Sequence, residues 1–173
     1  MAELLDLWQA ARVGVWVDGG WAVDALLGEQ SRRHRDVDIV VERRDVGRLR
    51  RLMAERGFGD RPRGDTTTWN FVLGDARGRD VDVHVITLEP DGTGRYSPDE
   101  NFPAGSLDGT GTIAGRAVRC VSALWLVRFK TGYAFDDDDV HDVLALCSRF
   151  GIAVPEAYQP AAERRRQSDP GAT

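Results

Sequence analysis

Apolar residues along the first half of the chain follow two alternating patterns. Apolar side chains recur every three or four residues, which predicts helices, at residues 2–12, 21–27 and 45–55. Short apolar or alternating runs, which predict strands, occupy residues 15–17, 36–41, 67–73 and 80–86. Helices and strands alternate at the start, and strands follow one another later. The pattern therefore predicts an α/β or α+β core with a mixed sheet.

The second half of the chain has a different organisation. Residues 88–112 are rich in Gly, Pro, Asp and Ser, and a loop of this length in a compact domain is usually functional or mobile. A small hairpin is expected at 113–121 and two helices at 122–133 and 139–150. We therefore predict a core over residues 1–121, a helical unit packed on it over 122–155, and a flexible tail over 156–173.

Composition narrows the class of protein. The chain has 173 residues, 42% of them hydrophobic, and a net charge of −5, which disfavours a nucleic-acid binder with a broad basic surface. No uncharged run is long enough for a membrane span, and the acidic amino end does not look like a leader, so we expect a cytoplasmic protein. Cys120 and Cys147 are isolated among apolar residues, which predicts core thiols.

Carboxylates alternate with apolar residues on two of the predicted strands. Asp36 and Asp38 are two positions apart and share one face of their strand, and Asp80, Asp82 and His84 do the same on theirs. These could be solvated outer faces, where alternating Asp costs little. If the two strands are neighbours, however, Asp82 completes a three-carboxylate site that suits divalent cations.

A glycine pair stands where the first strand meets the second helix. Glycine accepts positive φ and lets backbone N–H groups approach phosphate oxygens, so Gly19 and Gly20 are candidates for phosphate contact. The following helix would present its amino end to the same phosphates. The plainer interpretation is a tight connection between two elements.

These motifs together resemble a known family. The stretch from Asp18 to Gly28, followed by Arg35-Asp36-Val37-Asp38, is similar to the small antibiotic nucleotidyltransferases of the polymerase-beta-like superfamily. The resemblance covers residues 1–155 and is strongest to the lincosamide nucleotidyltransferases and aminoglycoside 2''-adenylyltransferases. The gap between glycine turn and carboxylates exceeds the usual superfamily spacing, as it does in these small members. The resemblance implies an α+β nucleotidyltransferase core, a mixed sheet flanked by helices, with a small carboxyl-terminal helical unit.

The resemblance also implies a reaction and roles for individual residues. Two magnesium ions would be held by Asp36, Asp38 and Asp82, and Asp82 would also serve as general base. A nucleoside monophosphate, AMP if the donor is ATP, would pass from a nucleoside triphosphate to a hydroxyl of a small antibiotic, with a lincosamide favoured over an aminoglycoside. The alternative is a nucleotidyltransferase antitoxin that modifies a protein partner. No nucleic-acid or membrane partner is expected, and the sequence leaves the oligomeric state open.

Cations for the triphosphate are expected among the basic residues of the family-like motifs. Gly19, Gly20, Arg35 and Lys130 form the predicted nucleotide-binding set, although a solvated basic loop and a surface lysine are equally good interpretations. The acidic run 136–139 is interpreted as a helix cap, with an acidic rim for an antibiotic amine as the alternative.

Overall fold

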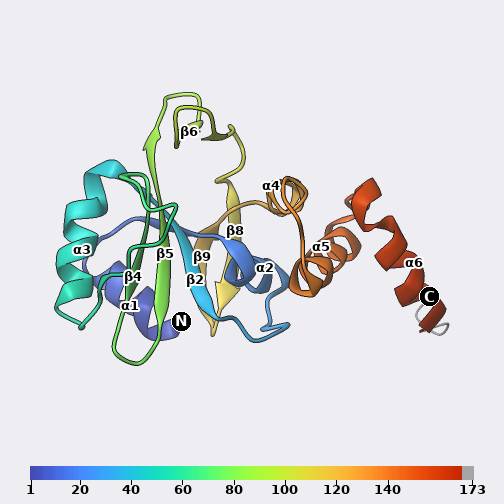
Figure 1. The fold of residues 1–173 in the computed structure, drawn as a ribbon, viewed down its shortest axis with the longest axis horizontal. Helices are drawn as coiled ribbons and strands as arrows, with labels where there is room; N and C mark the ends of the chain where they lie inside the picture. The colour runs from blue at the N-terminus through green and yellow to red at the C-terminus, as the bar shows by residue number, and fades with distance from the viewer. Residues whose placement is uncertain (169–173) are drawn as a thin grey trace. The chain divides into compact units, whose positions relative to one another are not determined.

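The computed structural model describes residues 1–168, which divide into two compact units, residues 1–122 and residues from 123 onward. The sheet of the first unit runs in the order β3-β4-β5-β2-β1-β9-β8 (Figure 1). Its strands are β1 (Val15–Val17), β2 (Asp36–Glu42), β3 (Gly59–Asp60), β4 (Asn70–Gly74), β5 (Asp80–Leu88), β8 (Gly109–Ile113) and β9 (Arg116–Cys120). Strands β2 and β5 are parallel, as are β1 and β9, and the other pairs in this order are antiparallel. The predicted mixed α+β sheet is confirmed.

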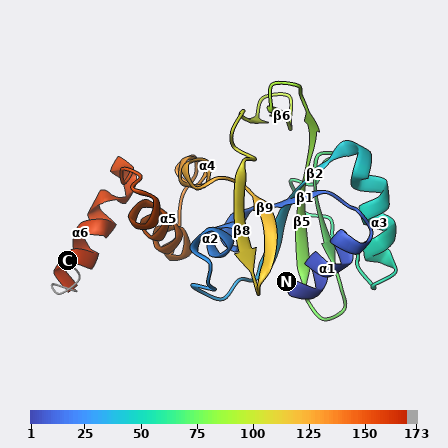
Figure 2. The same cartoon turned by 180° about the vertical axis from the view of Figure 1, so that it is seen from behind.

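Helices cover both faces of this sheet. Figures 1 and 2, seen from opposite sides, show α2 (Gly19–Leu27) on one face and α1 (Ala2–Ala10) on the other. Helix α3 (Val46–Ala54) shares the α1 face, because the Trp8 indole donates to the Met53 sulfur at 3.4 Å and Arg50 lies 3.8 Å over the Phe71 ring. A 3₁₀ turn (Arg43–Asp45) leads into α3.

Strands β2 and β5 lie side by side and keep their polar and apolar faces aligned. Their register pairs Asp36 with Asp80 and Asp38 with Asp82, so all four carboxylates project to one face. The intervening side chains, Ile39, Val81 and Val83 among them, are fully buried on the other face. The prediction that the two acidic strands are neighbours is confirmed, and the apolar face explains why the register is so well determined.

Three boundaries in the first unit differ from the prediction. Helix α2 begins at Gly19 rather than at residue 21, because Asp18 is its N-cap and the two glycines form its first turn. Strand β4 begins at Asn70. Part of the expected loop 88–112 is a hairpin extending from β5, formed by β6 (Gly94–Arg95) and β7 (Asn101–Phe102), and β8 already begins at Gly109.

The second unit consists of helices, and helical turns continue into its last segment. It contains α4 (Ala123–Phe129), α5 (Asp137–Phe150), a 3₁₀ turn (Glu156–Tyr158) and α6 (Gln159–Ser168). Tyr158 is fully buried, donates to the Lys130 carbonyl at 2.6 Å and stacks on Phe135. The segment predicted as a flexible tail thus contains a 3₁₀ turn and a helix up to Ser168, its flexibility stays a prediction, and residues 169–173 lie outside the described part of the chain. Each helix within residues 1–168 is too short or too polar to traverse a lipid bilayer.

Candidate active site

The glycine turn lies directly against the acidic strand. The Asp18 backbone N–H donates to the Asp38 carbonyl at 2.9 Å, and the Asp18 carboxylate caps α2 by accepting from the Gly19 N–H at 2.8 Å. Gly19 has a φ of +58°, and a Cβ at this position would overlap the Asp38 carboxylate. Only glycine allows both the left-handed turn and the close approach of Asp38.

We expect Gly19→Ala to disturb the site more than the fold. The left-handed backbone costs a non-glycine residue about 1–2 kcal/mol, and the added methyl group would push the Asp38 carboxylate aside. Thermal unfolding should show a modest fall in stability, while steady-state kinetics should show a much larger loss of turnover. As a control, Gly28→Ala, also at positive φ but with open space around it, should carry only the stability cost.

A buried carboxylate on α2 holds the loop that leads into β2. Asp24 is 2% exposed and accepts hydrogen bonds from the backbone N–H and hydroxyl of Ser31, at 2.9 and 2.7 Å. It also pairs with the His34 ring, which packs on Trp21 at 4.7 Å between centroids. Burial alone would raise the pKa of Asp24, but the hydrogen bonds from His34 and Ser31 outweigh it and hold the pKa below its usual value.

This carboxylate should make stability depend on pH in a defined direction. Because its folded-state pKa is lowered, Asp24 stabilises the fold above its unfolded-state pKa, and this contribution disappears as the pH falls through the folded-state value. Asp24→Asn should therefore lower the free energy of unfolding by about 1–3 kcal/mol at neutral pH. Urea unfolding of both proteins should show the gap closing in acid; a gap of constant size would contradict the assignment.

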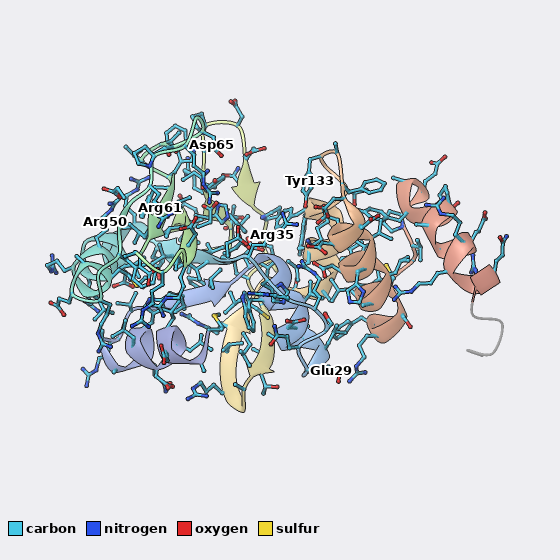
Figure 3. All side chains as sticks on the ribbon, turned by 60° about the horizontal axis from the view of Figure 1, so that its bottom comes forward. Glu29, Arg35, Arg50, Arg61, Asp65 and Tyr133 are labelled. Carbon is cyan, nitrogen blue, oxygen red and sulfur yellow. The ribbon has the colours of Figure 1, made fainter. Side chains whose placement is uncertain are left out.

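The basic residues of this loop lie in two different surroundings. Arg32 and His34 lie against the glycine turn, where a Cβ on Gly20 would overlap both side chains. Arg35, labelled in Figure 3, is exposed and has no hydrogen bond or ion pair with the described residues. Arg32 is thus placed against the turn, and the nucleotide contact of Arg35 stays a prediction.

Asp82 is half-buried and faces an arginine that the sequence analysis did not select. Arg63 Nη1 lies 3.4 Å from Asp82 Oδ2, and its Nη2 lies 3.3 Å from Asp80 Oδ2. The other oxygen, Asp82 Oδ1, is buried without a hydrogen-bond partner among the described residues. Burial raises the pKa of Asp82. The positive charges of His84 and Arg63 lower this pKa, while the Asp36 and Asp65 carboxylates raise it further.

The three predicted carboxylates are adjacent in the sheet, but their side chains do not converge. Within residues 1–168, no three His, Cys, Asp or Glu side chains are grouped so that they could hold a metal ion. That Asp36, Asp38 and Asp82 share a metal ion therefore stays a prediction, which requires a change of side-chain rotamers. Their separation has a local cause, because Asp38 points against Gly19 and Asp82 pairs with Arg63.

The donor set nevertheless fits a divalent cation after side-chain rotation. Asp38 and Asp82 are directly opposed on adjacent parallel strands, which are about 4.8 Å apart in any sheet, so convergence requires only new rotamers. Carboxylate oxygens are the ligands that magnesium prefers, and the buried, unpartnered Asp82 Oδ1 is an oxygen that a cation could satisfy.

Aromatic side chains flank the acidic face beyond Asp82. His84 follows Asp82 on the same face of β5, and its Nδ1 lies 3.1 Å from the Tyr96 hydroxyl. Tyr96 and Phe102, from the segment that follows β5, pack edge to face with centroids 5.7 Å apart. Burial raises the pKa of Tyr96 to about 12, with further contributions from Asp82 and other carboxylates, so its hydroxyl stays protonated and can donate.

Lys130 belongs to an ion-pair cluster within the second unit. Its ammonium lies 2.8 Å from Asp139 and 3.1 Å from Asp142, and the Tyr133 hydroxyl also donates to Asp139 at 3.0 Å. Asp139 in turn forms a capping box with Asp136 at the start of α5, which confirms the helix-cap interpretation of the acidic run. In this structure the Lys130 ammonium is engaged by two buried carboxylates, and its role in phosphate binding stays a prediction.

Three contributors to the site were missed from the sequence. Asp24 stands inside a helical pattern, Tyr96 in an apparent loop, and Arg63 in a turn-rich segment with no periodicity. The available signals were weak: an Asp on the buried side of α2, and a basic residue that precedes an acidic strand in the sequence. Their roles emerge only from the tertiary contacts.

The fold, with an acidic pair of strands beside a glycine turn, is next compared with known proteins, and the comparison gives the family of the chain. The family model described as aminoglycoside-2''-adenylyltransferase matches residues 1–146, and the chain belongs to this family. A lincosamide resistance protein of Staphylococcus haemolyticus is 28% identical over 152 residues, covering 84% of this chain and 91% of the relative. A 2''-aminoglycoside nucleotidyltransferase of Escherichia coli is 30% identical over 62% of this chain, which spans 58% of that relative.

Solved structures agree with this placement. The crystal structure of the lincosamide antibiotic adenylyltransferase LnuA with lincomycin bound superposes with a TM-score of 0.73 at 27% identity, covering 87% of this chain and 94% of that one. The structure of ANT(2'')-Ia in complex with adenylyl-2''-tobramycin has a TM-score of 0.70 at 23% identity, covering 93% of each chain, and supports the fold. The predicted class of enzyme is confirmed.

Proposed function

We propose that this enzyme transfers AMP from ATP to a hydroxyl group of a lincosamide antibiotic, with magnesium, on the acidic face of β2 and β5. The observation that carries the proposal is the register of Asp38 opposite Asp82, directly beside the Gly19 turn. This arrangement supports cation binding next to a phosphate-binding helix end.

Each part of the site has a distinct task in the proposal. Asp36, Asp38 and Asp82 would hold magnesium, which when bound neutralises charge on the triphosphate. The backbone at Gly19 and Gly20 heads α2 and would face the phosphates, with Arg32 close by. The network of Asp24 and His34 keeps this loop in place.

The transfer step balances with the groups present. The acceptor hydroxyl oxygen forms a bond to the α-phosphorus of ATP, and the bond from that phosphorus to the bridging oxygen breaks, so pyrophosphate leaves. Asp82 accepts the proton of the hydroxyl. Its position on the face that holds Asp38, with one oxygen lacking a partner, supports this role as general base.

The preference for a lincosamide rests on the neighbourhood of Asp82 and on the relatives. The rings of His84, Tyr96 and Phe102 offer apolar area beside the acidic face, which suits an acceptor that is partly apolar. An aminoglycoside carries several amines and would need more carboxylates at this position. The lincosamide resistance protein also matches over more of both chains than the aminoglycoside enzyme does.

A panel of acceptors tests the proposal. Purified enzyme is incubated with magnesium, ATP or another nucleoside triphosphate, and either lincosamides or aminoglycosides, and the products are weighed by mass spectrometry. We expect an AMP-sized gain on a lincosamide with ATP and a smaller or no gain on aminoglycosides. The reverse preference would overturn the acceptor, and a gain only on a protein partner would favour an antitoxin.

A further inference from the structure

The segment between β3 and β4 lays two arginines across the acidic face. Arg61, labelled in Figure 3, lies against Gly74 of β4, where a Cβ would overlap its side chain. Its Nε lies 3.3 Å from Asp80 Oδ1. Arg61 also donates to the Asp75 carbonyl. The Arg61 side chain is therefore held along its length by Gly74 and at its guanidinium by Asp80 and the Asp75 carbonyl.

Arg63 lacks the additional contacts that Arg61 makes with Gly74 and the Asp75 carbonyl, although the two side chains are almost equally exposed, 43% and 44%. Its guanidinium bridges Asp80 and Asp82 at 3.3 and 3.4 Å, at the long end of hydrogen-bond distances. Its backbone is fixed by the Thr66 hydroxyl, which accepts from the Arg63 N–H at 2.7 Å. The Arg63 side chain can thus move while its backbone stays in place. Breaking a partly exposed ion pair of this kind costs little free energy.

The position of Arg63 makes it a competitor for the carboxylate that a metal ion needs. Asp36, Asp38, Asp80 and Asp82 place four carboxylates on one face of two strands, and Arg63 is the cation that faces Asp82 in this structure. Arg63 pairs with Asp82 Oδ2, and a divalent ion on Oδ1 of the same carboxylate would repel the guanidinium, because two positive charges would then lie beside one carboxylate. A guanidinium also matches phosphate oxygens as well as it matches carboxylates.

We infer that Arg63 is an exchangeable cation, which pairs with Asp82 until a divalent ion takes that carboxylate and then binds the triphosphate of the nucleotide. The inference rests on the proposed function and extends it, because Arg63 adds a cation for the triphosphate that already lies on the acidic face. Asp80 keeps the guanidinium near the site throughout, since it contacts both Arg61 and Arg63.

The inference predicts opposite effects on two ligands. In Arg63→Gln, Mn²⁺ alone should bind about threefold more tightly, because a competitor for Asp82 is gone. An ATP analogue with a non-hydrolysable α,β-methylene bridge, in the presence of Mg²⁺, should bind about tenfold more weakly, because a charge-assisted phosphate contact is lost. Both affinities are measured by titration calorimetry on the full chain, so that neither depends on turnover.

The controls separate this role from a structural one. Arg44→Gln removes an equal charge from an exposed pair with Glu42 and should change neither affinity. Arg63→Lys should restore part of the nucleotide affinity. Weaker binding of both ligands to Arg63→Gln would show a purely structural role, and unchanged binding of both would show a surface ion pair; either result overturns the inference. A wild-type enzyme that binds no nucleotide analogue at all would instead overturn the proposed function.

Discussion

Asp82→Asn should abolish most of the activity without lowering stability. The substitution removes a magnesium ligand and the general base, and a lost general base alone reduces turnover by about 10²–10⁴-fold. It also removes a half-buried charge that burial and neighbouring carboxylates disfavour. Because the folded-state pKa of Asp82 is raised, its ionisation costs stability as the pH rises through this range, so the uncharged variant is spared that cost.

The measurement compares kinetics and thermal unfolding at neutral pH. We expect pyrophosphate release to fall by orders of magnitude while the melting temperature stays equal or rises. Asp60→Asn is the matched control, since Asp60 is an exposed carboxylate paired with Arg50 on the same unit, and it should leave turnover unchanged. Full turnover in Asp82→Asn, or a loss of activity that merely follows unfolding, would contradict the role assigned to Asp82.

Lys130→Met should have the largest effect on stability of any single substitution discussed. Lys130 is 8% exposed and its removal leaves Asp139 and the fully buried Asp142 without their cation. Breaking a buried ion pair from one side typically costs about 3–5 kcal/mol. Burial alone would lower the pKa of Lys130, but Asp139 and Asp142 raise it above its usual value.

The sign of the pH dependence follows from this shift. The stabilisation by Lys130 is fully present below its unfolded-state pKa and is lost as the pH rises through the raised folded-state value. At neutral pH the full penalty should therefore appear in urea unfolding of Lys130→Met. Arg128→Met, which removes an exposed cation from α4, should cost far less. A stable Lys130→Met that has lost nucleotide affinity would support the phosphate-binding role.

The sequence predicted those features of the site that depend on strand periodicity. Alternation of Asp with Val on both strands determined which side chains share a face, and the buried valines left one register available. The turn at Gly19 was also predictable, because few other residues accept its φ. The alternation along the two strands and the glycine turn therefore predict together where Asp38 and Asp82 lie relative to the turn.

Side-chain partners that come from irregular segments could not be predicted in this way. Arg63 reaches Asp82 only because a turn between β3 and β4 directs it there, and no periodic pattern marks that turn. Lys130 was predicted to bind phosphate from the family resemblance, and its two carboxylate partners lie nine and twelve residues later, beyond the reach of a helical rule. The segment after Pro155 was predicted to be flexible from its polar composition, and the burial of Tyr158 is a tertiary contact that composition does not reveal.

The central claim is that Asp38 and Asp82 hold one divalent ion together beside the glycine turn. The most direct test is anomalous diffraction from crystals of the enzyme grown with Mn²⁺ and the α,β-methylene ATP analogue. We predict a manganese peak within coordination distance of both carboxylates, with the triphosphate next to Gly19. A manganese ion bound without either carboxylate, or a nucleotide bound elsewhere on the molecule, would contradict the account.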